Sequence, residues 1–224
     1  MMSSTITPGG TPETNHYVDP LPIEVARPMV LLRLGYRRPS QVPEKIARLI
    51  DEVMERGRLL LEPKAVWTEV EVTAPEPGLI VLGGIVRTRS RSVHTRFSSC
   101  RAAAVFAATI GPGVDRLGHE WMEAGEMTRA LLIDAYGSSA ATALGLELER
   151  IVAAGFDAKD LRVTKRYAPG YGDWDLSDQQ PLLSLLDVAS IGVTLTEDHL
   201  MLPAKSISGL IGGRRIEPQT AAND

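Results

Sequence analysis

The sequence contains one cysteine, few aromatic residues and no surplus of positive charge. Cys100 alone cannot form an internal disulfide, and no CxxC or HxxxH spacing indicates a structural zinc site. Lysine and arginine total 24 and aspartate and glutamate total 28, so the formal net charge of −4 argues against sequence-independent binding of nucleic acid. With 44% hydrophobic and 23% charged residues, the 224-residue chain has the composition of a soluble globular protein.

Long hydrophobic runs and targeting signals are also missing. The longest apolar run near the middle of the chain, Ala102 to Ile110, spans nine residues and is too short to cross a bilayer. Its length is typical of a fully buried strand. The first twenty residues lack the basic start and apolar core of a secretory signal. We therefore expect a cytoplasmic protein that binds neither a membrane nor nucleic acid.

The chain is expected to form one domain between two flexible ends. Residues 1–25 are rich in proline, glycine, serine and threonine at their start, which predicts a flexible N-terminal extension. Residues 214–224 predict a flexible tail. No linker, repeat or low-complexity block divides residues 26–213, which are expected to fold as a single domain.

Hydrophobic periodicity predicts an α+β fold. Apolar residues at helical spacing follow Ser40 and predict a helix that ends near Gly57. A run with unusually small residues at its centre predicts a long, buried helix over residues 127–153. Because helices and strands do not alternate strictly, α+β is favoured over a doubly wound sheet. The remaining expected elements are strands at 67–73, 78–86, 102–110 and 161–167, helices at 114–123 and 181–186, and short extended pieces at 191–195 and 199–202.

The densest cluster of chemically unusual residues is the segment Arg166–Asp173, with the sequence RYAPGYGD. Pro169 removes a backbone donor, and the glycines at 170 and 172 permit close approach, so the loop can present backbone groups to a small ligand. Arg166 can pair with a carboxylate, and Tyr171 can stack on a ring. The alternative, which residue types alone favour, is an ordinary strand-to-helix turn whose aromatic residues cap the core.

No other segment predicts a catalytic or metal centre. Gly111–Gly113 lacks the lysine of a phosphate-binding loop, so a tight turn is favoured. Thr196–His199 resembles an acid–histidine set, but a capped turn is the better interpretation. Cys100 is expected to be a buried thiol, and Asp134, among apolar neighbours, is expected to face inward toward a polar partner. The sequence predicts neither catalytic residues nor metal ligands.

Three motifs in series resemble the activation domain of cobalamin-dependent methionine synthase. They are RYAPGYGD from Arg166, IGVTLTE from Ile191 and PAKSISG from Pro203, and they occur in the family's order and spacing. The upstream segments LGYR from Leu34 and ATIGPGVDR from Ala108 resemble freestanding members, so the likeness covers roughly residues 27–213. The resemblance implies an α+β domain with a twisted, mainly antiparallel sheet flanked by helices.

The resemblance also implies a function. It identifies a freestanding reactivation subunit that binds S-adenosylmethionine and docks on a corrinoid-binding methyltransferase, most simply a methionine synthase core. There it would support reductive methylation of cob(II)alamin with an electron from a flavodoxin-like donor. Cobalamin is expected only as carried by the partner, which supplies the chemistry while this chain supplies binding and orientation. Two alternatives are a docking or cap module without S-adenosylmethionine binding, and a reactivator of another corrinoid protein in one-carbon metabolism.

Five positions match the family's ligand contacts. The resemblance implies that Arg166 binds the carboxylate of the methyl donor and that Ala168 and Gly170 offer backbone contacts. It places Tyr171 near the ligand and the corrinoid, and Ser208 at a further contact.

The sequence departs from the family pattern at two places. The family has an acidic ligand contact one turn after the aspartate that Asp134 matches, but this chain has Ser138 there. The acidic residues Glu147 and Glu149 lie further along the same predicted helix. An aromatic run after the SxSG segment is replaced by Leu-Ile-Gly-Gly from Leu210. The corrinoid-binding DxHxxG motif is absent, so this chain alone is not expected to act as a methionine synthase.

Overall fold

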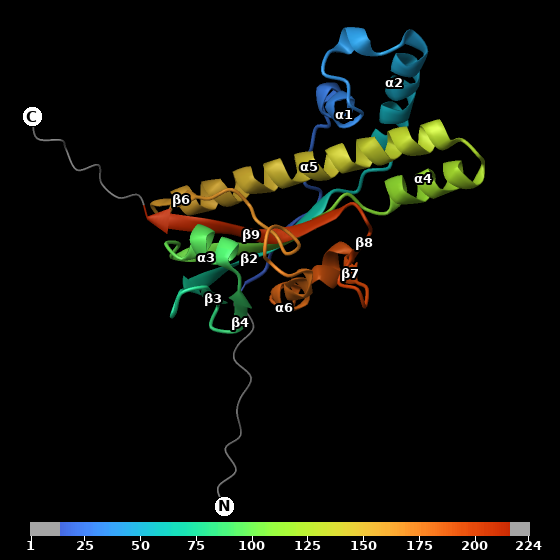
Figure 1. Ribbon diagram of the computed structural model, residues 1–224. Coiled ribbons are helices and arrows are strands. Elements are labelled where there is room, and N and C mark those ends of the chain that lie inside the picture. The colour runs from blue at the N-terminus through green and yellow to red at the C-terminus, as the bar shows by residue number, and fades with distance from the viewer. Residues whose placement is uncertain (1–13, 216–224) are drawn as a thin grey trace, which may run out of the picture.

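An antiparallel sheet with helices on both faces forms the fold of the computed structural model, which describes residues 14–215 (Figure 1). The described residues do not include 1–13 and 216–224. Most of the two predicted flexible ends therefore lies outside the described residues. Six strands follow the order β4-β3-β2-β5-β9-β6, and β1 pairs with the first part of β2. The elements are β1 (His16–Val18), α1 (Arg27–Arg33), η1 (Pro39–Gln41), α2 (Glu44–Arg58), β2 (Lys64–Thr73), β3 (Leu79–Leu82), β4 (Val86–Arg89), α3 (Arg91–Phe97), β5 (Ala102–Thr109), α4 (Gly113–Glu123), α5 (Met127–Asp157), β6 (Leu161–Val163), η2 (Leu176–Asp178), α6 (Gln179–Leu183), η3 (Val188–Ile191), β7 (Thr194–Leu195), β8 (Met201–Leu202) and β9 (Ser206–Arg215).

Strand β5 lies at the centre of the sheet and is buried on both faces. It pairs antiparallel with β2 on one side and with β9 on the other, each over eight residues. Because side chains alternate along a strand, Phe106 belongs to one hydrophobic cluster and Val105 to the other. The predicted buried strand at 102–110 is therefore confirmed.

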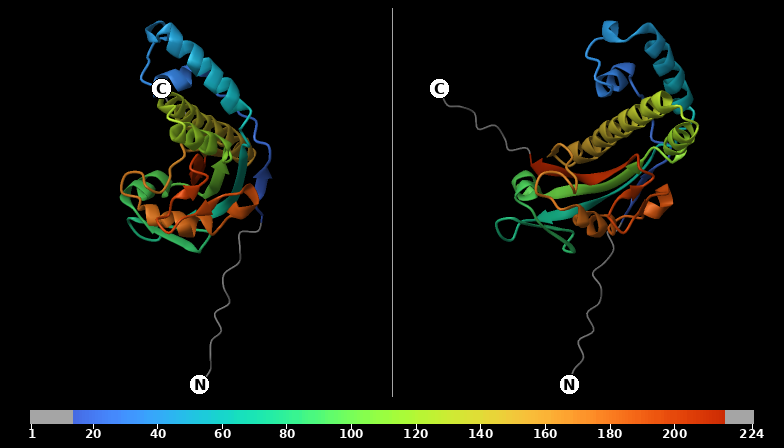
Figure 2. Two further views of the ribbon diagram at one scale, coloured as in Figure 1. Left: turned by 90° about the vertical axis from the view of Figure 1, so that its right-hand side faces the viewer. Right: turned by 45° about the vertical axis from the view of Figure 1, so that its right-hand side comes forward.

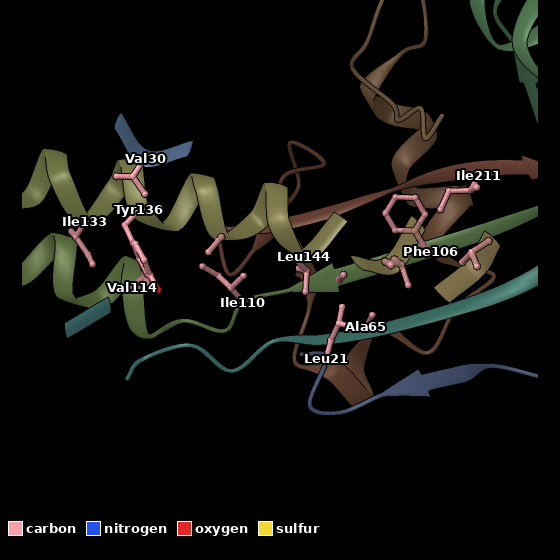
Figure 3. Close-up of a cluster of buried hydrophobic side chains, with 14 of the residues drawn as sticks. Leu21, Val30, Ala65, Phe106, Ile110, Val114, Ile133, Tyr136, Leu144 and Ile211 are labelled. Atoms are coloured by element: carbon pink, nitrogen blue, oxygen red, sulfur yellow. The ribbon is translucent and has the colours of Figure 1, made fainter. Parts of the chain in front are cut away.

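Helix α5 covers one face of the sheet along its length. Tyr136 and Leu144 of α5 belong to the same buried cluster as Phe106 of β5 and Ile211 of β9 (Figure 3). The small residues at the middle of α5 permit close packing, since a Cβ on Gly137 would lie 2.6 Å from Val114 of α4. Helices α1 and α2 pack on the side of α5 that faces away from the sheet (Figures 1 and 2).

The opposite face of the sheet is covered by short elements. Helices α3 and α6, the turns around them and the two-stranded β7–β8 sheet lie there (Figure 2). Phe97, Trp174 and Leu182 pack with Leu210 of β9 in the second buried cluster. This face positions the loop that follows β6.

The structure confirms most predicted elements and corrects several. The helices at 40–57, 114–123 and 127–153 correspond to α2, α4 and α5, and the α+β class is confirmed. The strand expected at 78–86 is part of a hairpin, β3 and β4, that turns at residues 83–85. Strands β1 and β9 and helices α1 and α3 were not expected, and β9 is one of the two longest strands.

The predicted flexible extension is too long at its C-terminal end. Residues His16–Val18 pair with β2, and Leu21 is fully buried in the first cluster, because this segment covers the edge of β2.

Within residues 14–215, no helix combines the length and apolar character needed to cross a membrane.

Candidate functional site

A groove of about 710 Å³ lies between α5, the loop after β6 and the segment that enters β9. Four of the five residues predicted from the resemblance line it, namely Arg166, Ala168, Tyr171 and Ser208. The fifth, Gly170, is in the same loop but is not among the lining residues. Residues more than forty positions apart in the sequence are therefore brought to one surface. We name this hollow the α5 groove.

Arg166 is positioned by strand pairing on one side and by helix α5 on the other. The next residue, Tyr167, exchanges two backbone hydrogen bonds with Leu210 of β9, at 3.0 and 2.8 Å. This close approach requires Gly209, whose φ is +146° and where a Cβ would lie 2.5 Å from the Tyr167 carbonyl oxygen. The guanidinium group then packs over Gly145 of α5, where a Cβ would lie 2.8 Å from Cζ.

Within the groove, Arg166 forms an ion pair with Glu149. Its Nη1 donates to Glu149 Oε1 at 2.7 Å, and the two side chains are 30% and 26% exposed. The partial burial shields the pair from solvent, so it is stronger than a fully exposed ion pair. Sequence reasoning named Glu149 only as an acidic residue beyond the expected register. The neighbouring Glu147 instead pairs with Arg150, whose hydrogen bond lowers the pKa of Glu147.

The loop from Tyr167 to Trp174 is held by its own hydrogen bonds. The Gly170 amide donates to the Trp174 carbonyl at 2.8 Å, and the Trp174 amide donates to the Tyr171 carbonyl at 3.0 Å. The Tyr167 ring stacks on Trp174, with ring centres 5.9 Å apart. Tyr171 is 66% exposed at the rim of the groove, where its ring is available to a ligand or partner.

Asp173 fixes this loop to the start of helix α3. Its carboxylate accepts hydrogen bonds from the Ser92 and Ser90 hydroxyls and from the backbone amides of Ser92 and Arg91. These hydrogen bonds hold the pKa of Asp173 well below its usual range, and the bond from the Ser92 hydroxyl has the largest effect. The loop is thus anchored to a second element and is more than an isolated turn.

Lys205 is a groove residue that sequence reasoning missed. Its ammonium group lies 2.6 Å from Asp134 Oδ1 and 2.9 Å from Ser138 Oγ. Asp134 was expected to face inward. It has the expected polar partner, but its side chain is 64% exposed, because Lys205 meets it at the helix surface. The lysine lies inside the PAKSISG motif, which was the available signal.

Ser208 is buried and its hydroxyl already has a partner. It donates to Gln179 Oε1 at 3.0 Å, and the Gln179 side-chain amide donates to the His199 carbonyl at 2.7 Å. This chain of contacts connects β9 to α6 and to the turn before β8. The expectation of a capped turn at Thr196–His199 is confirmed, since the His199 amide donates to the Thr196 carbonyl at 3.0 Å.

The other candidate segments have structural roles. Cys100 is buried, as expected, and burial raises the pKa of its thiol. Residues 110–112 form the tight turn between β5 and α4, and Gly113 is the first residue of α4. Among residues 14–215, no group of three or more histidine, cysteine, aspartate or glutamate residues is arranged to hold a metal ion.

Comparison with known proteins points to one family. The family described as "Vitamin B12 dependent methionine synthase, activation domain" matches residues 95–216. The crystal structure of the MetH reactivation domain bound to AdoHcy has a similar fold, with a TM-score of 0.66 and 15% sequence identity. The similarity covers 93% of this chain and 81% of that one. Among curated proteins, none matches this chain.

Proposed function

The chain belongs to the activation-domain family of vitamin B12 dependent methionine synthase, and we propose that it binds S-adenosylmethionine in the α5 groove and acts as a freestanding reactivation subunit. Its client would be a corrinoid-binding methyltransferase, most simply a methionine synthase core. The flavodoxin-like electron donor implied by the resemblance and the cytoplasmic location expected from the lack of targeting signals are part of this proposal.

One observation supports the proposal most strongly. Arg166, Ala168, Tyr171 and Ser208, chosen from motif matches alone, line a single groove of about 710 Å³, a volume suited to a nucleoside ligand. The fit extends to charge, because the Arg166 guanidinium can bind the carboxylate of the ligand bidentately. Glu149, beside it, can accept hydrogen bonds from the ligand's ammonium group.

The residues of this chain would act by positioning. The ligand's amino acid part would lie at the Arg166–Glu149 pair, and Tyr171 at the open rim would face both the ligand and the docked partner. The partner's corrinoid and an external one-electron donor would supply the chemistry, in which cob(II)alamin gains one electron and a methyl group and S-adenosylhomocysteine leaves. Holding the methyl donor at a fixed place converts a rare encounter into an oriented one.

Calorimetric titration of the full chain with S-adenosylmethionine and S-adenosylhomocysteine tests the proposal. We expect micromolar binding, and Arg166→Ala should weaken it by about 2 kcal/mol, or roughly thirtyfold in Kd, because a charge-assisted bond is lost. Arg150→Ala is the matched control, since Arg150 lies on α5 and pairs with Glu147 outside the groove. Unchanged affinity of the Arg166→Ala chain would remove the proposed anchor.

The ion pair also favours a second candidate function. The Arg166 guanidinium already donates to Glu149, and while it stays paired it has fewer N–H donors for a ligand carboxylate. The chain would then be a docking or cap module that covers the partner's corrinoid without binding S-adenosylmethionine. Binding to a corrinoid-loaded methyltransferase that is insensitive to S-adenosylmethionine, with no heat of titration for the chain alone, would establish this second function.

A further inference from the structure

A second hollow, separate from the α5 groove, is lined by residues of α3, of β6 and the loop after it, and of the end of β9. Its volume is about 430 Å³, and Lys165 lines both hollows. We name it the basic groove because five of its seven lining residues are cationic and the other two, a valine and a threonine, are uncharged. The five cations are Arg96, Arg162, Lys165, Arg214 and Arg215.

These cations are not neutralised by the described part of the chain. Ten ion pairs occur within residues 14–215, yet none of the five groups has a carboxylate oxygen within 4.0 Å. This is a local excess, since the whole chain has a net charge of −4. A concave surface of one charge sign concentrates the electrostatic potential and attracts anions.

Two of the arginines are fixed in place by the fold. The guanidinium of Arg214 donates to the Arg96 carbonyl oxygen at 2.6 Å. The guanidinium of Arg96 lies over the Tyr167 ring, 4.4 Å from its centre. Most of their N–H donors remain available, because a guanidinium group has five.

The strand register adds a second observation. Arg162 of β6 is directly opposite Arg214 of β9 in the antiparallel pairing. Like charges at directly opposed positions destabilise a sheet. An anion bound between the two side chains would remove this repulsion and turn both groups into favourable contacts.

We propose that the basic groove binds a phosphorylated small molecule of nucleotide size, with Arg162 and Arg214 holding its phosphate groups. Guanidinium forks match phosphate oxygens bidentately, and the charges of Arg162 and Arg214, which share one face of the sheet, exceed what one carboxylate would neutralise. The volume of about 430 Å³ leaves room for more than the phosphates. This site goes beyond the proposed function, since neither Arg166 nor Glu149 lines it.

Calorimetry of the full chain with inorganic pyrophosphate and with ADP tests the proposal, with ribose as the uncharged comparison. We expect both anions to bind and ribose not to bind. The double variant Arg162→Ala/Arg214→Ala should weaken both affinities by about tenfold or more, because two charge-assisted contacts are lost. Removal of the opposed like charges and loss of the hydrogen bond from Arg214 to Arg96 act in opposite directions on the melting temperature, so a thermal melt without ligand serves only to show that the double variant is folded. Arg87→Ala, at an exposed strand position outside both grooves, is the matched control and should bind as the original chain does.

Three results would overturn the assignment. The first is the absence of pyrophosphate and ADP binding. The second is binding by the double variant with the same affinities as the original chain. The third is a loss of affinity in the Arg87→Ala control as large as that in the double variant. Binding of polyglutamate without binding of pyrophosphate or ADP would also overturn it, because the groove would then be a surface for an acidic protein. S-adenosylhomocysteine is titrated in parallel, so that failure of the α5 groove and failure of the basic groove are distinguished.

Discussion

The guanidinium of Arg166 and the carboxylate of Glu149 lie 2.7 Å apart in the α5 groove, although the two residues come from different elements. Glu149 is on the long helix, and Arg166 follows strand β6. The pair puts a positive and a negative group side by side, which is the complement of the ammonium and carboxylate of an amino acid. We therefore expect the amino acid part of the proposed ligand to lie at this end of the groove.

Replacement of Glu149 by glutamine tests this orientation. We expect Glu149→Gln to weaken binding of S-adenosylhomocysteine by about tenfold, because the ligand's ammonium group loses a charged acceptor. Binding of 5′-methylthioadenosine, which lacks the amino acid part, should be unchanged by the same substitution. Both affinities are measured by calorimetry.

Glu147→Gln is the control for this experiment. Glu147 is two residues away on the same helix but pairs with Arg150 and does not line the groove. Its replacement should leave both affinities unchanged. Tighter binding of S-adenosylhomocysteine by the Glu149→Gln chain would show that Glu149 competes with the ligand for Arg166, contrary to the proposed orientation.

Gly145 controls the place of the Arg166 guanidinium. A Cβ at this position would lie 2.8 Å from Cζ and 3.0 Å from Nη1 of Arg166, so Gly145→Ala should displace the guanidinium from the helix surface. We expect binding of S-adenosylhomocysteine to fall by about tenfold, because the charged contact is misplaced. Folding should be affected less, since alanine is the better helix former.

Gly155→Ala separates the effect of crowding from the effect of helix propensity. Gly155 is on the same helix, is exposed, and has no atom within 4 Å of the added Cβ. We expect this substitution to stabilise the chain by about 0.5–1 kcal/mol and to leave ligand binding unchanged. Equal binding by the Gly145→Ala and Gly155→Ala chains would contradict the role assigned to Gly145.

Much of the fold follows from local sequence patterns, but strand β9 does not. Its sequence, SISGLIGGRR, contains three glycines, which are unfavourable in a strand when only local propensity is considered. Tertiary packing explains why glycine occurs at two of these positions. A Cβ on Gly212 would lie 2.5 Å from Cys100 Sγ, and one on Gly213 would lie 2.8 Å from Phe156. A pattern of this kind cannot be recognised before the neighbours of the strand are known.

In the candidate site, too, some residues could be predicted from the sequence and others depend on tertiary packing. The motif resemblance selected Arg166 and Tyr171, because the RYAPGYGD segment is distinctive along the chain. It did not select Glu149 or Lys205, because their places depend on the packing of α5 against the β6–β9 region. The assignment of Arg166 and Glu149 as ligand contacts stays a prediction, which the titrations of their variants test.

Asp173 gives a prediction about pH, because it connects the loop of the site to helix α3. Its carboxylate accepts hydrogen bonds from Ser92, Ser90 and Arg91, and these hold its pKa well below the usual range. Asp173→Asn should therefore lower the melting temperature at neutral pH, because the charged acceptor at the start of α3 is lost. Asp198→Asn, at an exposed turn position, is the control and should melt as the original chain does.

The difference in melting temperature between the original chain and Asp173→Asn should depend on pH in one direction. Because the pKa of Asp173 is lower in the folded chain than in the unfolded chain, the unfolded chain binds more protons in acid. The stabilisation is fully present above the ordinary aspartate pKa of about 3.9 and is lost as the pH falls below it. Thermal melts from neutral pH into the acid range should show the two curves converging. A difference that stays constant down to the lowest pH at which the chain folds would mean that the charge of Asp173 does not stabilise the loop.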